Sequence, residues 1–146
     1  MAIDTTVFYE IATDDGSQHY LQKNPNGENL IVTTVKPQDG SQLFKFEDAS
    51  IQNGNQLWRI KQGEGFLHVN GFEYGTEVLL NPISSTLFIV DGDTELVSIE
   101  FVNPSDYTPT GFYLEVFYTG VNAGALTVQP APKKWKFTRV NSRIPL

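Results

Sequence analysis

The sequence predicts an all-β protein with one domain, in which a four-strand unit is repeated three times. The first observation is a motif that occurs three times in 146 residues: an apolar residue, a spacer, a proline, a polar turn, and an aromatic residue two positions before another apolar one. The prolines lie 45 and 48 residues apart, and the aromatic residues lie 44 and 47 apart. A period of this size in a small chain indicates a repeated structural unit. The residues are Pro37, Pro82 and Pro130, followed by Phe44, Phe88 and Trp135.

Two further observations support this expectation. An aromatic-Leu pair recurs at spacings of 46 and 47, as Tyr20-Leu21, Phe66-Leu67 and Tyr113-Leu114. No stretch shows the 3.6-residue period of a helix, and short runs rich in β-branched and aromatic residues alternate with turn residues. One unit has too little surface to bury its apolar face alone, so three units are expected to share a core.

Each predicted strand is an apolar run bounded by a turn signal such as Asn24-Pro25-Asn26-Gly27. In chain order we expect strands over 6–11, 19–23, 30–35 and 43–47, then 56–61, 66–69, 77–80 and 87–90, then 96–102, 113–118, 125–129 and 134–140. The longest predicted loop is 103–111. Strand alternation is expected to point six residues inward: Tyr9, Ile11, Trp58, Ile60, Ile99 and Phe101.

Twelve short strands in three sets of four, closing into a six-stranded barrel with a hairpin cap, describe a β-trefoil, and the chain resembles that fold from Thr6 to Val140. The expected repeats span about 6–50, 51–93 and 94–140 of a single domain, 1–146. The chain also resembles ricin-B-like trefoils, because Gln42-Leu43-Phe44 is similar to their Gln-x-Trp signature. The other two copies of this segment lack the Gln: Thr86-Leu87-Phe88 and Lys133-Lys134-Trp135.

The composition argues against several classes of function. The net charge of −7 argues against a nucleic-acid partner, because such binding depends on Lys and Arg that neutralise phosphates. No apolar run is long enough for a membrane span. The chain has no cysteine, no basic and apolar leader and no glycosylation sequon, and these features predict a cytoplasmic protein. We expect a monomer or a weak dimer.

The sequence favours a binding protein over an enzyme, and we expect no cofactor and no metal site. Two histidines, His19 and His68, are expected to be half-exposed strand residues on different lobes. Asp14-Asp15 is interpreted as turn chemistry, and Glu47-Asp48 would point to opposite faces of a strand. No phosphate loop, nucleophile elbow or metal-binding spacing occurs.

The first functional hypothesis is protease inhibition. In length, composition and repeat layout the chain resembles fungal mycocypin and cocaprin-type inhibitors of cysteine proteases, some of which also block aspartic proteases. The resemblance implies that exposed loops enter or cover the active-site cleft of the protease. A loop of this kind needs glycine where backbone approaches backbone. The candidate residues are Asp14, Asp15, Gly16 and Ser17, then Gln38, Asp39 and Gly40, and, for a second target, Asp106 and Tyr107.

The alternative hypothesis is a carbohydrate-binding lectin of the ricin-B-like type. The resemblance implies an Asp directly after each aromatic-Leu pair, but this chain has Gln22, His68 and Glu115 there. Possible partners are Asn24 and Asn29 in the first unit, Asn70 and Tyr74 in the second, and Tyr118 and Asn122 in the third. The best predicted sugar site is Glu115 with Tyr118 and Asn122. Phe72, Tyr74 and Tyr107 would either stack on a sugar or cap the barrel.

Overall fold

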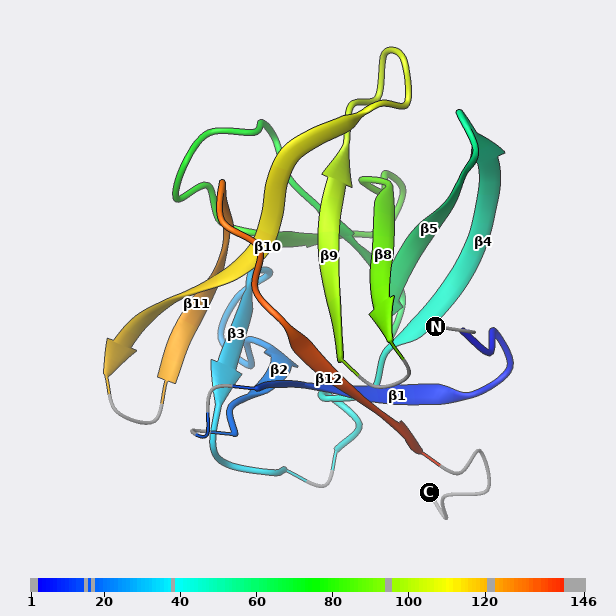
Figure 1. Ribbon diagram of the computed structural model, residues 1–146. Helices are drawn as coiled ribbons and strands as arrows, with labels where there is room; N and C mark the ends of the chain where they lie inside the picture. The colour runs from blue at the N-terminus through cyan, green and yellow to red at the C-terminus, as the bar shows by residue number, and fades with distance from the viewer. Residues whose placement is uncertain are drawn as a thin grey trace.

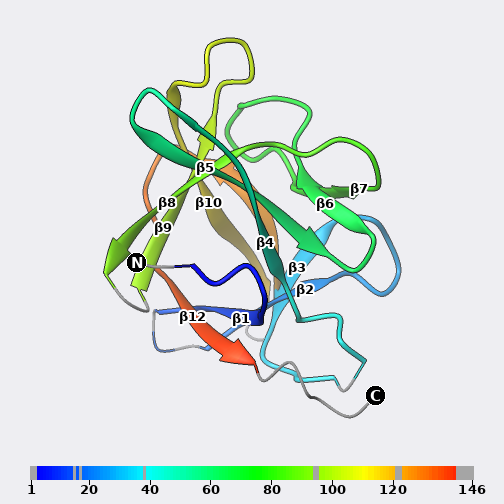
Figure 2. The same cartoon turned by 90° about the vertical axis from the view of Figure 1, so that its right-hand side faces the viewer.

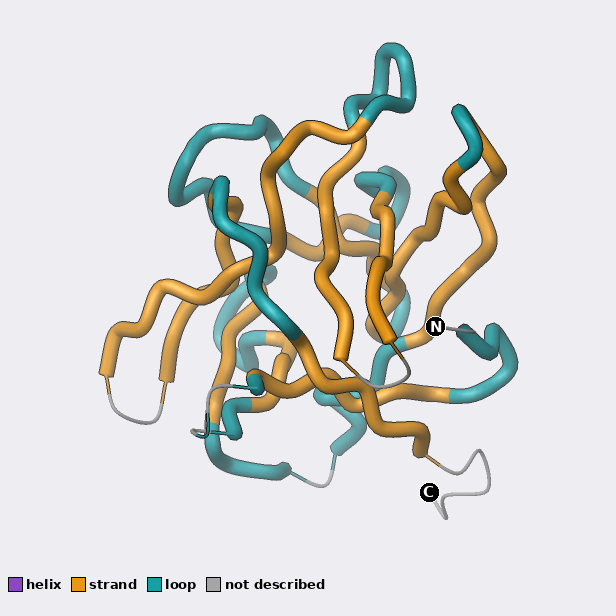
Figure 3. Tube along the Cα trace, in the orientation of Figure 1, coloured by secondary structure: helices purple, strands orange, loops and turns teal. Residues whose placement is uncertain are grey.

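A computed structural model of the chain describes residues 3–14, 16, 18–37, 39–93, 96–120 and 123–140. Within these ranges the regular structure consists entirely of strands, drawn in orange in Figure 3. None of the described residues form a helix long and apolar enough to cross a membrane. The predicted all-β class is therefore confirmed.

The strands fall into three lobes of four, one for each predicted unit. Lobe one contains β1 (Phe8–Thr13), β2 (Tyr20–Lys23), β3 (Leu30–Thr33) and β4 (Lys45–Gln52). Lobe two contains β5 (Asn55–Gln62), β6 (Gly65–His68), β7 (Leu79–Asn81) and β8 (Phe88–Asp93). Lobe three contains β9 (Leu96–Val102), β10 (Pro109–Gly120), β11 (Ala123–Gln129) and β12 (Trp135–Val140).

The first and last strands of each lobe form the barrel (Figure 1). Antiparallel ladders connect them in the order β1–β12–β9–β8–β5–β4, and the ladders between named strands leave this path open. A single bridge joins its ends, since Tyr9 N–H donates to Phe44 O at 2.8 Å and Phe44 N–H donates to Tyr9 O at 2.9 Å. The barrel thus closes at the residue immediately before β4.

The middle two strands of each lobe form a hairpin, and the three hairpins cap the barrel (Figure 2). They contact one another through the β3–β11 ladder and through the bridges Asn29–Leu79 and Glu77–Thr127. A six-strand barrel capped by three hairpins is the β-trefoil that the repeats predict.

The repeated aromatic residues fill the shared core. Phe44, Phe88 and Trp135 are all fully buried, and the buried Trp135 indole donates its Nε1–H to Leu114 O at 3.1 Å. Burying one such side chain contributes roughly 2–3 kcal/mol. Five of the six residues expected to face inward are buried, whereas Trp58 is only partly buried and packs against Phe46. The aromatic residues that repeat along the sequence are therefore the residues that fill the shared core.

The long loop before β10 is shorter than expected. The sequence predicts a loop over 103–111, but β10 begins at Pro109, which pairs with Val102. The register then shifts before Tyr113, and Gly111 in this bulge has a φ of 77°. A proline is compatible with the end of a strand. The bulge accommodates residues 109–111 within β10, although their strand propensity is low and predicts a loop.

Candidate functional site

The residues that follow the three aromatic-Leu pairs occupy equivalent positions in the hairpins. Their strands pair in matching registers, Gln22 with Ile31, His68 with Leu79 and Glu115 with Thr127. The preceding Leu of each pair is fully buried, so strand alternation directs these polar side chains away from the core. The three lobes therefore carry different side chains at the same structural position: an amide, an imidazole and a carboxylate.

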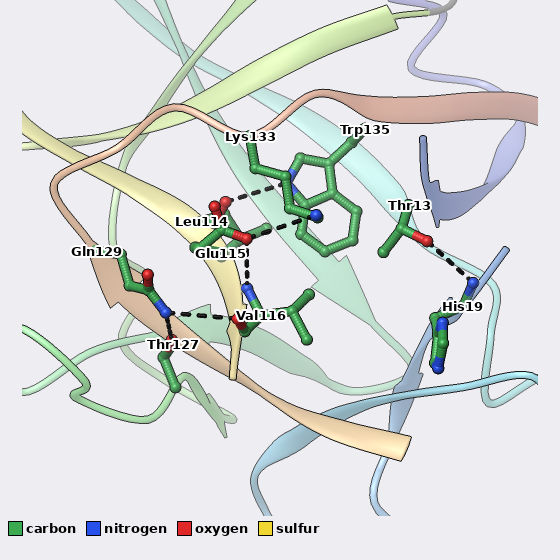
Figure 4. Close-up of polar contacts among 9 residues, drawn as sticks. All are labelled: Thr13, His19, Leu114, Glu115, Val116, Thr127, Gln129, Lys133 and Trp135. Carbon is green, nitrogen blue, oxygen red and sulfur yellow. Dashed lines mark hydrogen bonds and ion pairs between the residues drawn. The ribbon is translucent and has the colours of Figure 1, made fainter. Parts of the chain in front are cut away.

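In lobe three this position is already engaged (Figure 4). Glu115 Oε1 accepts a hydrogen bond from Val116 N–H at 2.9 Å and lies 3.6 Å from Lys133 Nζ. Beside it, Gln129 Nε2 donates to Thr127 Oγ1 at 3.1 Å and to Val116 O at 3.4 Å. The Glu115 and Lys133 side chains retain only 17% and 15% of their exposure, so the pair is largely enclosed.

The remaining residues of the predicted lobe-three site have different environments. Tyr118 is 40% exposed, and its ring meets the His19 ring edge-on at 5.0 Å between centroids. His19 is 2% exposed and its backbone N–H donates to Thr13 Oγ1, so the expectation of a half-exposed residue is wrong for His19. The cause is the β10–β11 hairpin, which covers the imidazole with Tyr118. Asn122 lies outside the described residues.

In lobe one the equivalent position is also engaged. Gln42 Nε2 donates to Gln22 Oε1 at 3.0 Å and to Val35 O at 2.7 Å. Both glutamine side chains are buried. In the same lobe Asn24 Nδ2 donates to Asn29 Oδ1 at 2.9 Å, so these two predicted sugar partners bind each other.

Lobe two differs, because its polar position borders a pocket of about 470 Å³, a size typical of small-molecule sites. We call it the lobe-two pocket. It lies between β6, the loop after β6, the β7–β8 loop and the β9–β10 loop. It is lined by Arg59, His68, Val69, Asn70, Gly71, Phe72, Ile83, Ser85, Thr86, Leu87, Val102, Pro104 and Tyr107.

His68 lines this pocket and carries a hydrogen-bonding atom without a partner among the described residues. Its Nε2 lies 3.1 Å from Asn70 Oδ1, and in the neutral tautomer that donates Nε2–H to this oxygen, Nδ1 is an acceptor. His68 Nδ1 is buried and has no hydrogen-bond partner among the described residues; Gln42 Oε1 is the other such atom. A buried acceptor without a donor costs about 1–3 kcal/mol.

Apolar and aromatic side chains form another part of the pocket wall. Ile83 is 88% exposed and Tyr107 is 37% exposed, while Phe72 packs against Phe101 at 6.0 Å between ring centroids. Phe72 thus covers the core and also lines the pocket. Tyr74 is exposed and does not line the pocket.

Tyr107 is held in a strained conformation at the pocket. Its φ of 61° lies in the left-handed region, which bulky residues rarely adopt. Tyr107 N–H donates to Asn103 O at 2.8 Å, and the Asn53 side-chain amide donates to the carbonyl oxygens of Asp106 and Tyr107 at 3.3 Å each. Strain of this kind costs about 1–3 kcal/mol and is concentrated at functional sites.

The first-lobe loops predicted to contact proteases lie at the opposite end of the molecule from the β9–β10 loop (Figures 1 and 2). Asp14, Gly16, Asp39 and Gly40 are exposed, and the two glycines have φ values of 83° and 80°. The hydrogen bonds from the Ser41 hydroxyl and Ser41 N–H lower the pKa of Asp39. Asp15, Ser17 and Gln38 lie outside the described residues.

Asp106 and Tyr107 belong to the β9–β10 loop, and their side chains have different environments. Asp106 is exposed and accepts hydrogen bonds from Thr108 Oγ1 at 2.7 Å and Thr108 N–H at 3.1 Å, which lower the pKa of Asp106. Tyr107, its neighbour, lines the lobe-two pocket. The structure therefore brings one residue predicted for protease contact together with Asn70, a possible sugar partner, and with His68, which replaces the expected Asp.

Several pocket residues are missed by reasoning from the sequence. Strand alternation places Arg59 on the face opposite Trp58 and Ile60, but only the folded chain shows which loops cover that face. Ile83, Ser85 and Thr86 belong to the β7–β8 connection, which reads as an ordinary turn. One sequence feature does point to this connection: Thr86 stands where the Gln-x-aromatic pattern has a Gln.

Comparison with known proteins supports the fold. No protein-family model matches the chain, and no curated protein sequence matches it. Among solved structures, the chain is similar to SeviL bound to asialo-GM1 saccharide, with a TM-score of 0.62 and 20% sequence identity over 92% of this chain and 99% of that one. The resemblance to fungal protease inhibitors stays a prediction. At this level of identity the similarity establishes that the chain has the β-trefoil fold.

Proposed function

We propose that the protein binds saccharides and that the lobe-two pocket is the binding site. One observation carries the proposal: His68 lines the pocket, and its buried Nδ1 has no partner among the described residues. The equivalent side chains in the other lobes, Gln22 and Glu115, bind Gln42 and Lys133. Lobe two alone therefore offers this position to a ligand.

The wall of the pocket has the chemistry that a sugar requires. A saccharide presents hydroxyl groups at its edge and C–H groups on its ring faces. His68 Nδ1 would accept a hydrogen bond from a hydroxyl, and Asn70 is adjacent to it. Tyr107 and Phe72 provide aromatic surface for a C–H face. The structural similarity to SeviL, which is bound to a saccharide, supports the same class of ligand for this chain.

The test is a glycan array with the full chain, followed by titration of the best glycan. We expect His68→Phe, which keeps a planar ring but removes the acceptor, to weaken binding at least tenfold. Tyr74→Ala is the matched control, since it removes an exposed aromatic side chain outside the pocket. Failure of the wild-type chain to bind any glycan would refute the proposal.

The predicted lobe-three site at Glu115, Tyr118 and Asn122 is decided by the same titration. Glu115→Ala lowers the affinity if the saccharide binds there and leaves it unchanged if the saccharide binds in lobe two. A loss with Glu115→Ala and none with His68→Phe would move the site to lobe three.

Protease inhibition is a second candidate, and the loop around Gly40 supports it. Gly40 O accepts hydrogen bonds from Leu43 N–H and Gln62 Nε2, both at 3.1 Å, so the loop is fixed at its base. A preorganised loop loses less entropy on binding. Titration against papain and pepsin tests this candidate. Stoichiometric loss of activity supports it, provided that a bulky residue at Gly16 or Gly40 abolishes the effect; full residual activity of both enzymes argues against it.

A further inference from the structure

Arg59 contributes a cation to the lining of the lobe-two pocket. It lies on β5 between Trp58, which packs against Phe46, and the fully buried Ile60, so alternation turns its side chain outward to the pocket. The Arg59 side chain makes no hydrogen bond and no ion pair with any residue that the structure describes. Its cross-strand neighbour is Glu47, but no ion pair joins them.

The surroundings of Arg59 make this arrangement unusual for the chain. The protein carries 17 acidic residues against 10 basic ones, yet the described lining of the pocket contains no Asp or Glu. Arg59 is partly buried as a residue. A guanidinium offers five N–H donors in a planar fork that matches a carboxylate or a sulfate.

His68 Nδ1 and the Arg59 guanidinium require different ligand atoms. His68 Nδ1 is an acceptor and needs a donor such as a hydroxyl, whereas Arg59 only donates and is best matched by an anionic acceptor. The apolar wall at Ile83 and Tyr107 excludes a ligand that is charged throughout. A molecule that satisfies all three conditions carries hydroxyl groups, an apolar ring face and one acidic substituent.

We propose that the lobe-two pocket selects anionic saccharides, bearing a carboxylate or a sulfate group, over their neutral counterparts, and that Arg59 determines this preference. The inference rests on the proposed saccharide binding and adds the class of saccharide. Arg59 is assigned to the acidic substituent, and His68 and Tyr107 to the sugar ring.

The experiment compares matched oligosaccharides that are neutral, sulfated, sialylated or uronate-containing, titrated into the full chain at low and physiological salt. We expect the wild-type chain to favour an anionic member at least tenfold. The preference should fall as salt rises, because screening weakens the charge contact. The sulfated and carboxylated arms identify which acidic group Arg59 recognises.

The deciding variant is Arg59→Met, with Lys61→Met as the matched control. Lys61 lies two residues along the same strand, outside the pocket lining, and its removal changes the net charge equally. Arg59→Met should lose the anionic preference and keep the affinity for the neutral sugar, while Lys61→Met keeps both. Equal binding of neutral and anionic sugars by the wild-type chain overturns this inference and leaves saccharide binding intact. If the wild-type chain binds inorganic sulfate but no saccharide, both this inference and the proposed saccharide binding are overturned.

Discussion

The side-chain amide of Asn53 donates to the carbonyl oxygen of Tyr107 at 3.3 Å, and both residues have left-handed backbone conformations, with φ values of 53° and 61°. Asn53 lies in the tight turn between β4 and β5, and Tyr107 lies in the loop between β9 and β10. The contact connects the turn that joins lobes one and two to a loop of lobe three. It therefore fixes one wall of the lobe-two pocket from a residue 54 positions away in the sequence.

Removing this contact should weaken ligand binding more than it weakens the fold. Asn53→Gly keeps the turn, because glycine adopts a positive φ without strain. The free energy of unfolding should change by less than about 1 kcal/mol, since the lost hydrogen bonds are exposed. Glycan affinity, measured by calorimetry, should fall about threefold to tenfold because Tyr107 is less preorganised. Asn26→Gly, in an exposed turn of lobe one, is the control and should bind like the wild type.

Tyr107→Asn separates the aromatic ring from the backbone conformation. Asparagine tolerates the left-handed region better than tyrosine, so the stability should stay within about 1 kcal/mol of the wild type or rise slightly. Glycan affinity should drop at least tenfold because the stacking surface is lost. Chemical denaturation and titration measure the two effects. Unchanged affinity would exclude Tyr107 from the site.

Acid should loosen the β9–β10 loop through Asp106. The hydrogen bonds from Thr108 lower the pKa of Asp106 from its ordinary value of 3.8, so the folded state favours the carboxylate. A carboxyl with a lowered pKa contributes stability above its unfolded value and loses it as the pH falls through the folded value. Stability from this group should therefore be constant at pH 5–7 and decline below about pH 4.

Asp4 and Asp39 also have lowered pKa values because of hydrogen bonds to their carboxylates. All three residues therefore contribute to the destabilisation of the wild type by acid. The difference between the wild type and Asp106→Asn isolates the loop. Thermal unfolding from pH 3 to 7 should show the two proteins converging below pH 4. A constant difference across that range would contradict the role given to Asp106.

Gly92→Ala should unfold the barrel or destabilise it by more than about 3 kcal/mol. Gly92 has a φ of 147°, and a Cβ atom there would collide with the backbone of Leu96 and lie 2.9 Å from Val97 Cα. Gly71→Ala is the control, because a Cβ at Gly71 meets nothing within 4 Å and its φ is not positive. Equilibrium denaturation compares the two variants, and similar midpoints would show that β8 can move away from β9.

The sequence by itself determined the fold to a large extent. The motif that places Phe44, Phe88 and Trp135 at a fixed period predicted a threefold core, and all three side chains are fully buried. Apolar burial is the main stabilising term in folding, so a regular apolar pattern constrains the architecture directly. Strand ends were less predictable, because β10 begins at Pro109 through a bulge that depends on pairing with β9.

The candidate site was decided by tertiary structure. The sequence identifies Gln22, His68 and Glu115 as equivalent positions, but it does not reveal that Gln42 and Lys133 engage two of them. Nor does it reveal that Arg59 and Tyr107, 48 residues apart, line the same pocket as His68. A repeat fixes which positions are equivalent, because equivalent positions share a backbone environment. Which of them remains open to a ligand depends on side chains from other strands and loops, and only the folded chain brings these together.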